Sequence, residues 1–217
     1  MGSREAIKRA RTWLEVCLSE HKGTCATPHS TKLPTRVLRI GGPQQVALHI
    51  SNSEKASYIC LSHCWGEKSH TLLRTTTTTL QRFQSDISWG ELPNTFRDAI
   101  HVTYQLGYNF LWIDSLCIVQ DSTEDWRREG SMMADIYESA IVTIAATKAP
   151  NAHSGLFAHT DSEYISHVME LNPQEFGPGK VEHAVHARKC LPHEMLHPSD
   201  DLPLLSRAWV EFRQEYQ

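Results

Sequence analysis

The sequence predicts an α/β protein with a small parallel sheet flanked by helices, an N-terminal helix, a β-hairpin and an irregular C-terminal segment. Three short apolar runs, at residues 58–61, 110–113 and 141–146, are typical of buried parallel strands. Helical patterns separate these runs, so the expected order is β-α-β-α-β. The 217 residues suit a single domain with its core at about residues 58–157, because a second full domain would be cramped.

The first elements precede this core. Residues 4 to about 21 form an amphipathic pattern, and we expect this helix to pack on the sheet through one side, formed by Ile7, Ala10, Trp13, Leu14 and Cys17. Residues 37–40 and 46–50 then read as two short strands around a Gly41-Gly42-Pro43 turn. The threonine run at 75–79 is interpreted as a loop that leads into a helix.

Two crossover helices follow. Thr95 with Asp98 three residues later predicts a helix N-cap, and Gly107 predicts the end of that helix. Its expected buried side consists of Phe96, Ala99, Ile100 and Thr103. Ser122 or Thr123, with Asp125, predicts the start of the next helix. The residues expected on its buried side are Trp126, Met133, Ile136, Tyr137 and Ala140. Residues 158–217 show no sustained period, although 181–190 suit one more strand or a short helix.

The loops after the three strands carry the candidate catalytic residues. Parallel neighbouring strands bring these loops to one edge, where open α/β sheets usually bind ligands. The side chains expected there are His63, Cys64, Trp65, Asp114, Cys117, Asp121, His153 and Ser154. A Cys-His pair with a carboxylate is suited to nucleophilic or acid-base chemistry. The alternative is structural, with the cysteines and the tryptophan in the core and Asp114 capping a helix.

A second group, Cys17, His21, Cys25 and His29, repeats at four-residue intervals. Thiolate and imidazole are zinc ligands, so Cys17, His21 and Cys25 are a candidate zinc site. Gly23 and Pro28 interrupt the helical spacing, and the alternative is a half-buried helix end with unligated side chains.

Charge and composition limit the class of protein. A net charge of -4 and a pI near 6.3 give no basic surface for nucleic acid. No apolar stretch approaches the about 20 residues that span a bilayer. The amino terminus lacks the apolar core of a signal peptide, and the six cysteines then indicate a reducing compartment, so we expect a cytoplasmic protein.

Five segments, in order, carry a resemblance to a known family. They are YICLSHCWG at 58–66, LPNTFRDAIHVTYQLG at 92–107, WIDSLCIVQD at 112–121 with MADIYESAIVTIAA at 133–146, SGLF at 154–157, and LLSRAW at 204–209. Together they resemble the heterokaryon-incompatibility (HET) domain of fungal proteins. One departure lies near the end, where Gln214 and Glu215 come about two positions late, and we expect a short form with an apparently truncated C-terminal part.

The resemblance implies a role in fungal non-self recognition, where incompatible alleles in a fused cell trigger growth arrest and death. The family has been likened to the Toll/interleukin-1 receptor (TIR) fold, so a TIR-like sheet and NAD as a possible substrate are expectations at the level of analogy. The expected partner is a second copy or another incompatibility protein. Two alternatives remain: an enzyme of fungal small-molecule metabolism on a HET-like scaffold, and a non-catalytic self-association module.

Overall fold

The computed structural model describes residues 4–20, 31–66, 72–157, 167–169, 185–187 and 204. The elements before the core are α1 (Arg4–Glu20), β1 (Thr31–Lys32), β2 (Arg36–Gly42), β3 (Gln45–Ile50) and β4 (Lys55–Ala56). The core contains β5 (Ile59–Ser62), α2 (Leu80–Ser85), the 3-10 turn η2 (Trp89–Glu91), α3 (Asn94–Gln105), β6 (Phe110–Ile113), α4 (Asp114–Cys117), α5 (Thr123–Ser131), α6 (Met133–Glu138) and β7 (Val142–Ala145). Two short strands follow, β8 (His167–Met169) and β9 (Val185–Ala187).

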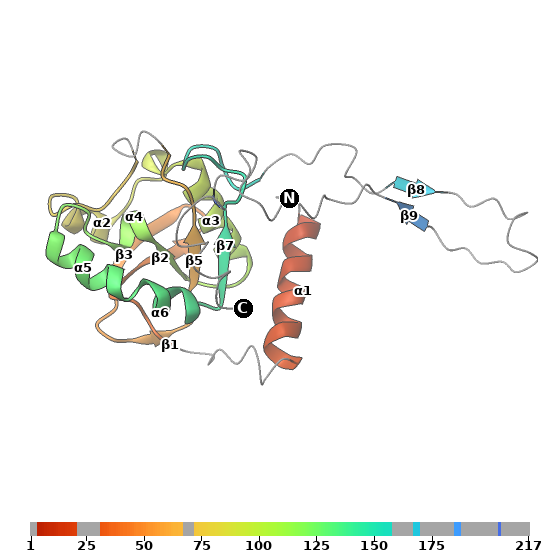
Figure 1. Cartoon of the computed structure of the whole chain (residues 1–217), viewed down its shortest axis with the longest axis horizontal. Coiled ribbons are helices and arrows are strands. Elements are labelled where there is room, and N and C mark those ends of the chain that lie inside the picture. Colours follow the sequence, from red (N-terminus) through yellow and green to blue (C-terminus); the bar gives the residue numbers. More distant parts are fainter. Residues whose placement is uncertain are drawn as a thin grey trace, which may run out of the picture.

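A five-stranded sheet in the order β3-β2-β6-β5-β7 forms the centre of the molecule (Figure 1). The three expected strands are adjacent and parallel, with Ile59 opposite both Leu111 of β6 and Val142 of β7. This part of the fold prediction is confirmed. The strand at residues 141–146 was expected to be buried, but β7 lies at the sheet edge and is only partly buried.

The predicted hairpin is present as β2 and β3, and it belongs to the same sheet. β2 pairs antiparallel with β6, with Leu38 opposite Leu111, so the sheet is mixed rather than purely parallel. Val37 and Leu38 are fully buried, because β2 is an interior strand. The hairpin therefore extends the core and places the side chain of Arg36 beneath the helices that follow β6.

The two crossovers cover opposite faces of the sheet. β6 lies on one side of β5 and β7 on the other, and right-handed connections in opposite directions put their helices on opposite faces. α3 makes the first connection, and α5 with α6, visible at the near face in Figure 1, make the second. Each face of β5 and β6 is thus shielded from water by one helical layer, whereas Thr143 and Ala145 of the edge strand β7 remain exposed.

The burial of α3 matches the prediction, but its cap does not. Phe96, Ala99 and Ile100 are fully buried, and Gly107 follows the helix with a left-handed φ of 90°. The helix starts at Asn94 after Pro93, with no side-chain cap. The expected Thr95 and Asp98 capping arrangement is wrong, because both side chains bind the segment after β7 instead.

The second crossover differs more from its prediction. The Ser122 cap is confirmed, since its hydroxyl accepts a hydrogen bond from the Asp125 N–H at 3.2 Å. The single expected helix is split at Met132 into α5 and α6. Trp126 was expected on the buried side, yet 55% of its surface is exposed, and the side chains of α5 that are buried are Asp125 and Glu129.

The N-terminal helix forms as predicted, but it does not pack as predicted. α1 has no buried residue, and Trp13 is 67% exposed. Arg11 donates a hydrogen bond to the Gln105 carbonyl at the end of α3, so the expectation that the helix packs on the sheet is wrong. Among the described helices, none combines the length and apolar character that a membrane span requires.

Part of the C-terminal region is described. β8 and β9 pair antiparallel, and β9 lies in the segment 181–190 where a strand or short helix was expected. Leu204, from the LLSRAW segment, is buried, and its N–H donates to the Thr147 carbonyl at 3.5 Å. This contact places Leu204 next to the end of β7.

Candidate functional site at the carboxyl edge of the parallel strands

Asp114 occupies the centre of the candidate site, directly after β6 and at the first position of α4. Its side chain is 10% exposed. One carboxylate oxygen accepts the Ser115 N–H at 2.7 Å, and the other accepts the indole N–H of Trp65 at 3.0 Å. Because Ser115 lies in α4 directly after β6 and Trp65 lies in the loop after β5, the carboxylate joins two of the three strand ends.

His63 follows β5 and lies against Asp114. The imidazole Nδ1 is 3.7 Å from the Asp114 Oδ1, and the His63 side chain is 1% exposed. Phe96 of α3 meets the imidazole edge-on, with ring centroids 4.9 Å apart and an interplanar angle of 89°. The expected meeting of His63 and Asp114 therefore occurs, with a phenylalanine from the first crossover fixing the orientation of the imidazole ring.

The two candidate cysteines are buried. Cys64 is 8% exposed and Cys117 is fully buried. The Cys117 sulfur accepts the Ile113 N–H at 3.4 Å, and burial raises the pKa of this thiol to about 12. Burial also raises the pKa of Cys60, which the sequence reasoning did not single out. Thiols in this state are neutral near pH 7, and the thiolate is the nucleophilic form.

Asp121 makes its contacts elsewhere. Its carboxylate accepts the Thr77 N–H at 2.8 Å and the Thr77 hydroxyl at 2.7 Å. These hydrogen bonds from Thr77 lower the pKa of the exposed Asp121 carboxyl. Asp121 thus links the turn before α2 to the loop after α4. It does not join the pair of His63 and Asp114, which meet at the ends of β5 and β6.

The loop after β7 docks on the start of α3. The Thr95 hydroxyl accepts the Gly155 N–H at 3.0 Å, and the Asp98 carboxylate accepts the Leu156 N–H at 2.9 Å. The Asn94 amide donates to the carbonyl oxygen of His153 at 2.9 Å, while the His153 side chain is exposed. The family-like SGLF segment is thus bound by the family-like LPNTFRDAI segment.

A close approach also links the loops after β5 and β7. Gly66 has a φ of 84°, and a Cβ built on it would lie 2.6 Å from the Asn151 Cβ. Only glycine fits this position without displacement of the neighbouring loop. Successive strands are added on one side of β5 as far as β6 and on its other side at β7, and open α/β sheets usually form their crevice at such a switch point.

Sequence reasoning missed a charged cluster beneath this edge. Buried Arg36 of β2 donates to the Cys117 carbonyl at 2.7 Å and to the Asp125 carboxylate, and its guanidinium lies 3.7 Å from Glu129. Arg128 also donates to Asp125 and, at 3.2 Å, to Glu129. The local period of α5 carries no sign of this cluster, because Arg36 is distant in sequence.

The candidate zinc site is only partly visible. Cys17 lies half-buried in α1, whereas His21, Cys25 and His29 lie outside the described residues. Within the described part of the chain, no group of three or more His, Cys, Asp or Glu side chains is arranged to hold a metal ion. The zinc hypothesis therefore stays a prediction.

Two open cavities among the described residues lie away from the strand-end site. One, of about 350 Å³, is lined by residues 32–35, 50–53, Tyr58 and parts of 132–139. The other, of about 550 Å³, lies along the β2–β3 hairpin and includes Arg39 and Asp86. Neither lining includes His63, Cys64, Asp114 or Cys117.

The fold and site define an α/β domain with its motif residues gathered at the carboxyl edge of three parallel strands. The sequence model of the family "Heterokaryon incompatibility protein (HET)" matches residues 58–213. The chain belongs to this heterokaryon-incompatibility family, and its role is related to heterokaryon incompatibility. Comparisons with curated proteins and with solved structures gave no match.

Proposed function

We propose that this protein is an effector of fungal non-self recognition that causes growth arrest and death through the site containing His63 and Asp114. The family supports the incompatibility role. The choice of site is supported by the titratable side chains of His63 and Asp114 at the strand ends. They are 1% and 10% exposed, and their nearest polar atoms are 3.7 Å apart. Burial of such groups is unfavourable unless they are paired, and functional sites concentrate them at this edge.

The test is expression in a fungal host with growth as the readout. Asp114→Asn keeps the size of the side chain and an oxygen that accepts the Trp65 N–H, but removes the charge. We expect the unaltered protein to arrest growth, and Asp114→Asn and His63→Ala to be harmless. The matched control is Asp86→Asn, since Asp86 is exposed and lines the cavity along the β2–β3 hairpin, away from Asp114. Growth arrest by a folded Asp114→Asn protein at full strength contradicts the proposal.

The chemistry we propose for this effector is NAD hydrolysis. The parallel strands lie in the order second, first, third along the chain, as at the start of a doubly wound sheet, which supports the TIR-like interpretation. Water replaces nicotinamide at C1′ of the ribose, nicotinamide leaves with the bonding electron pair, and one proton is released. In this scheme Asp114 faces the positive charge that develops on the ribose, and His63 positions Asp114.

Purified full-length protein incubated with NAD provides a separate measurement. We expect nicotinamide release that rises with protein concentration and is lost in Asp114→Asn. Toxicity in the host without nicotinamide release from the purified protein contradicts NAD hydrolysis and favours the self-association module. Concentration-dependent oligomers measured by light scattering, equally present in Asp114→Asn, then identify that module.

A further inference from the structure

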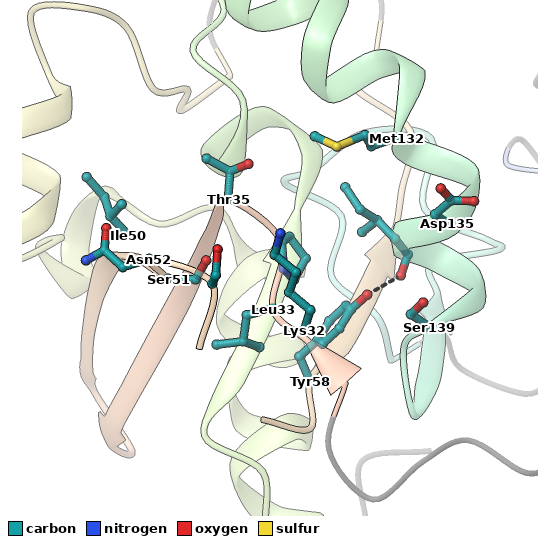
Figure 2. A pocket seen from close by; sticks show the side chains of 13 residues that line it. Lys32, Leu33, Thr35, Ile50, Ser51, Asn52, Tyr58, Met132, Asp135 and Ser139 are labelled. Carbon is teal, nitrogen blue, oxygen red and sulfur yellow. Dashed lines mark hydrogen bonds between the residues drawn. The ribbon is translucent and has the colours of Figure 1, made fainter. Parts of the chain in front are cut away.

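A small cavity lies at the opposite end of β5 from His63. Tyr58, immediately before β5, contributes to its floor, and three stretches form its walls, namely residues 32–35, residues 50–53 and the α6 region from Met132 to Ser139 (Figure 2). Its volume of about 350 Å³ falls within the range of about 300–1,000 Å³ that small-molecule sites occupy.

The floor of the cavity is apolar and fixed. Leu33, Tyr58 and Ile136 are 2%, 1% and 5% exposed. The Tyr58 hydroxyl donates to the Ile136 carbonyl oxygen at 2.6 Å, the dashed line in Figure 2, so the polar atom of Tyr58 is already hydrogen-bonded. These three side chains close the floor, and the apolar surface that a ligand can reach comes from Ile50, which is 37% exposed, and the partly buried Met132.

The mouth of the cavity carries one side chain of each charge. Lys32 enters from the strand side and Asp135 from α6, and both are exposed. Neither forms an ion pair with another described residue. A ligand with an anionic and a cationic group can pair with both, which a ligand of one charge cannot do.

The turn beside the mouth has a hydrogen-bonded, left-handed backbone. Asn52 and Ser53 have φ values of 45° and 66°, and the Glu54 N–H donates to the Ser51 carbonyl at 2.8 Å. Two consecutive left-handed residues define a type I′ turn, which glycine and asparagine adopt more readily than serine. The Ser51 side chain is buried below the turn. This wall is preformed, and a preformed wall reduces the entropy that a ligand loses on binding.

We propose that this cavity binds a small zwitterionic molecule with an apolar side chain, in the chemical class of the apolar α-amino acids, tryptophan included. Its carboxylate pairs with Lys32, its ammonium group pairs with Asp135, and its side chain contacts the apolar walls at Ile50 and Met132. The site is separate from His63 and Asp114, so it is independent of NAD hydrolysis.

Three probes test the charge pattern on the full-length protein by titration calorimetry. They are L-tryptophan, which carries both charges, tryptamine, which carries only the cation, and indole-3-propionate, which carries only the anion. We expect L-tryptophan to bind with a Kd below about 1 mM. We expect each single-charge probe to bind about two- to fivefold more weakly, the size of an exposed ion pair.

Two variants give opposite patterns if the assignment is right. Asp135→Asn weakens L-tryptophan and tryptamine and leaves indole-3-propionate unchanged, whereas Lys32→Gln weakens L-tryptophan and indole-3-propionate and leaves tryptamine unchanged. The matched controls, Glu138→Gln and Lys55→Gln, lie outside the lining and leave all three affinities unchanged. Met132→Trp fills the cavity and abolishes binding.

Three results overturn the proposal. The first is no binding of L-tryptophan at millimolar concentration by the folded protein. The second is equal binding of all three probes. The third is affinity that neither Asp135→Asn nor Lys32→Gln changes, which places the ligand elsewhere on the molecule.

Discussion

The two crossover helices of the parallel sheet bury opposite kinds of side chain. α3 turns Phe96, Ala99 and Ile100 toward the sheet, whereas α5 turns Asp125 and Glu129 inward and leaves Trp126 55% exposed. Both helices begin after a strand of the same sheet and cover one of its faces. The difference arises from β2, because Arg36 lies under α5 and supplies the counter-charge for its acids. Which face of a helix is buried thus depends on the residues packed opposite it as well as on the sequence pattern of the helix itself.

The largest expected effect comes from removal of the counter-charge. Arg36→Met leaves the half-exposed Arg128 as the one cation that pairs with buried Asp125 and Glu129 among the described residues, and we expect the free energy of unfolding to fall by about 3–5 kcal/mol. Urea unfolding measures the loss. Adding Glu129→Gln to Arg36→Met is expected to recover part of it. A double variant less stable than Arg36→Met alone contradicts the role given to Arg36.

The apolar helix provides the matching experiment. Ile100→Ala opens a cavity in the fully buried face of α3, and we expect a loss of about 2–5 kcal/mol in the same unfolding assay. Glu129 occupies the comparable inward position on α5. Because Ile100 makes no charged contact, no second neutralising substitution of the kind used for Arg36 should restore stability. Recovery by such a substitution would show that the two helices are held by the same forces.

A third expectation concerns pH at the junction of β6 and α4. Burial raises the pKa of Cys117 from 9.0 to about 12. The folded protein therefore holds the thiol proton more tightly than the unfolded chain does. This contribution to stability is complete below pH 9 and is lost as the pH rises toward 12, with a slope of at most about 1.4 kcal/mol per pH unit. Cys117→Ala should reduce the slope of stability against pH in that window, and an unchanged slope would contradict the burial of the thiol.

The smallest effect is expected at the exposed tryptophan. Trp126→Ala should change the free energy of unfolding by less than about 0.5 kcal/mol, as for other surface substitutions. Its indole fluorescence should also be quenched readily by acrylamide in the folded protein. A loss of about 3 kcal/mol or more, the size expected for a core aromatic residue, would mean that α5 is turned the other way and that the contrast with α3 is false.

The sequence predicted the strands well because their signal is local. Residues 58–61 and 110–113 are apolar at every position, and such runs are typical of buried strands. The buried side of α3 followed in the same way from its spacing. The meeting of His63 with Asp114 required only that β5 and β6 be parallel neighbours. The expected crossover predicted this arrangement, and the register of Leu61 opposite Ile113 confirms it.

Long-range pairs account for the errors. The orientation of α5 depends on Arg36, and the role of Thr95 and Asp98 depends on backbone N–H groups of Gly155 and Leu156. No window around either helix contains these partners. Local patterns alone therefore placed Trp126 on the buried side of α5 and assigned Thr95 and Asp98 of α3 to a cap. The cavity near Tyr58 was missed for the same reason, since three separate stretches form it.

The contact between the start of α3 and the segment after β7 limits how this domain can be recombined. Thr95 and Asp98 bind the backbone of Gly155 and Leu156, and Gly66 leaves just enough space for Asn151. Exchange of residues 151–157 alone with those of a divergent homologue would separate a loop from the helix that holds it. A chimera that exchanges residues 92–107 together with 151–157 keeps both sides of this contact. The two segments should therefore be exchanged as one unit.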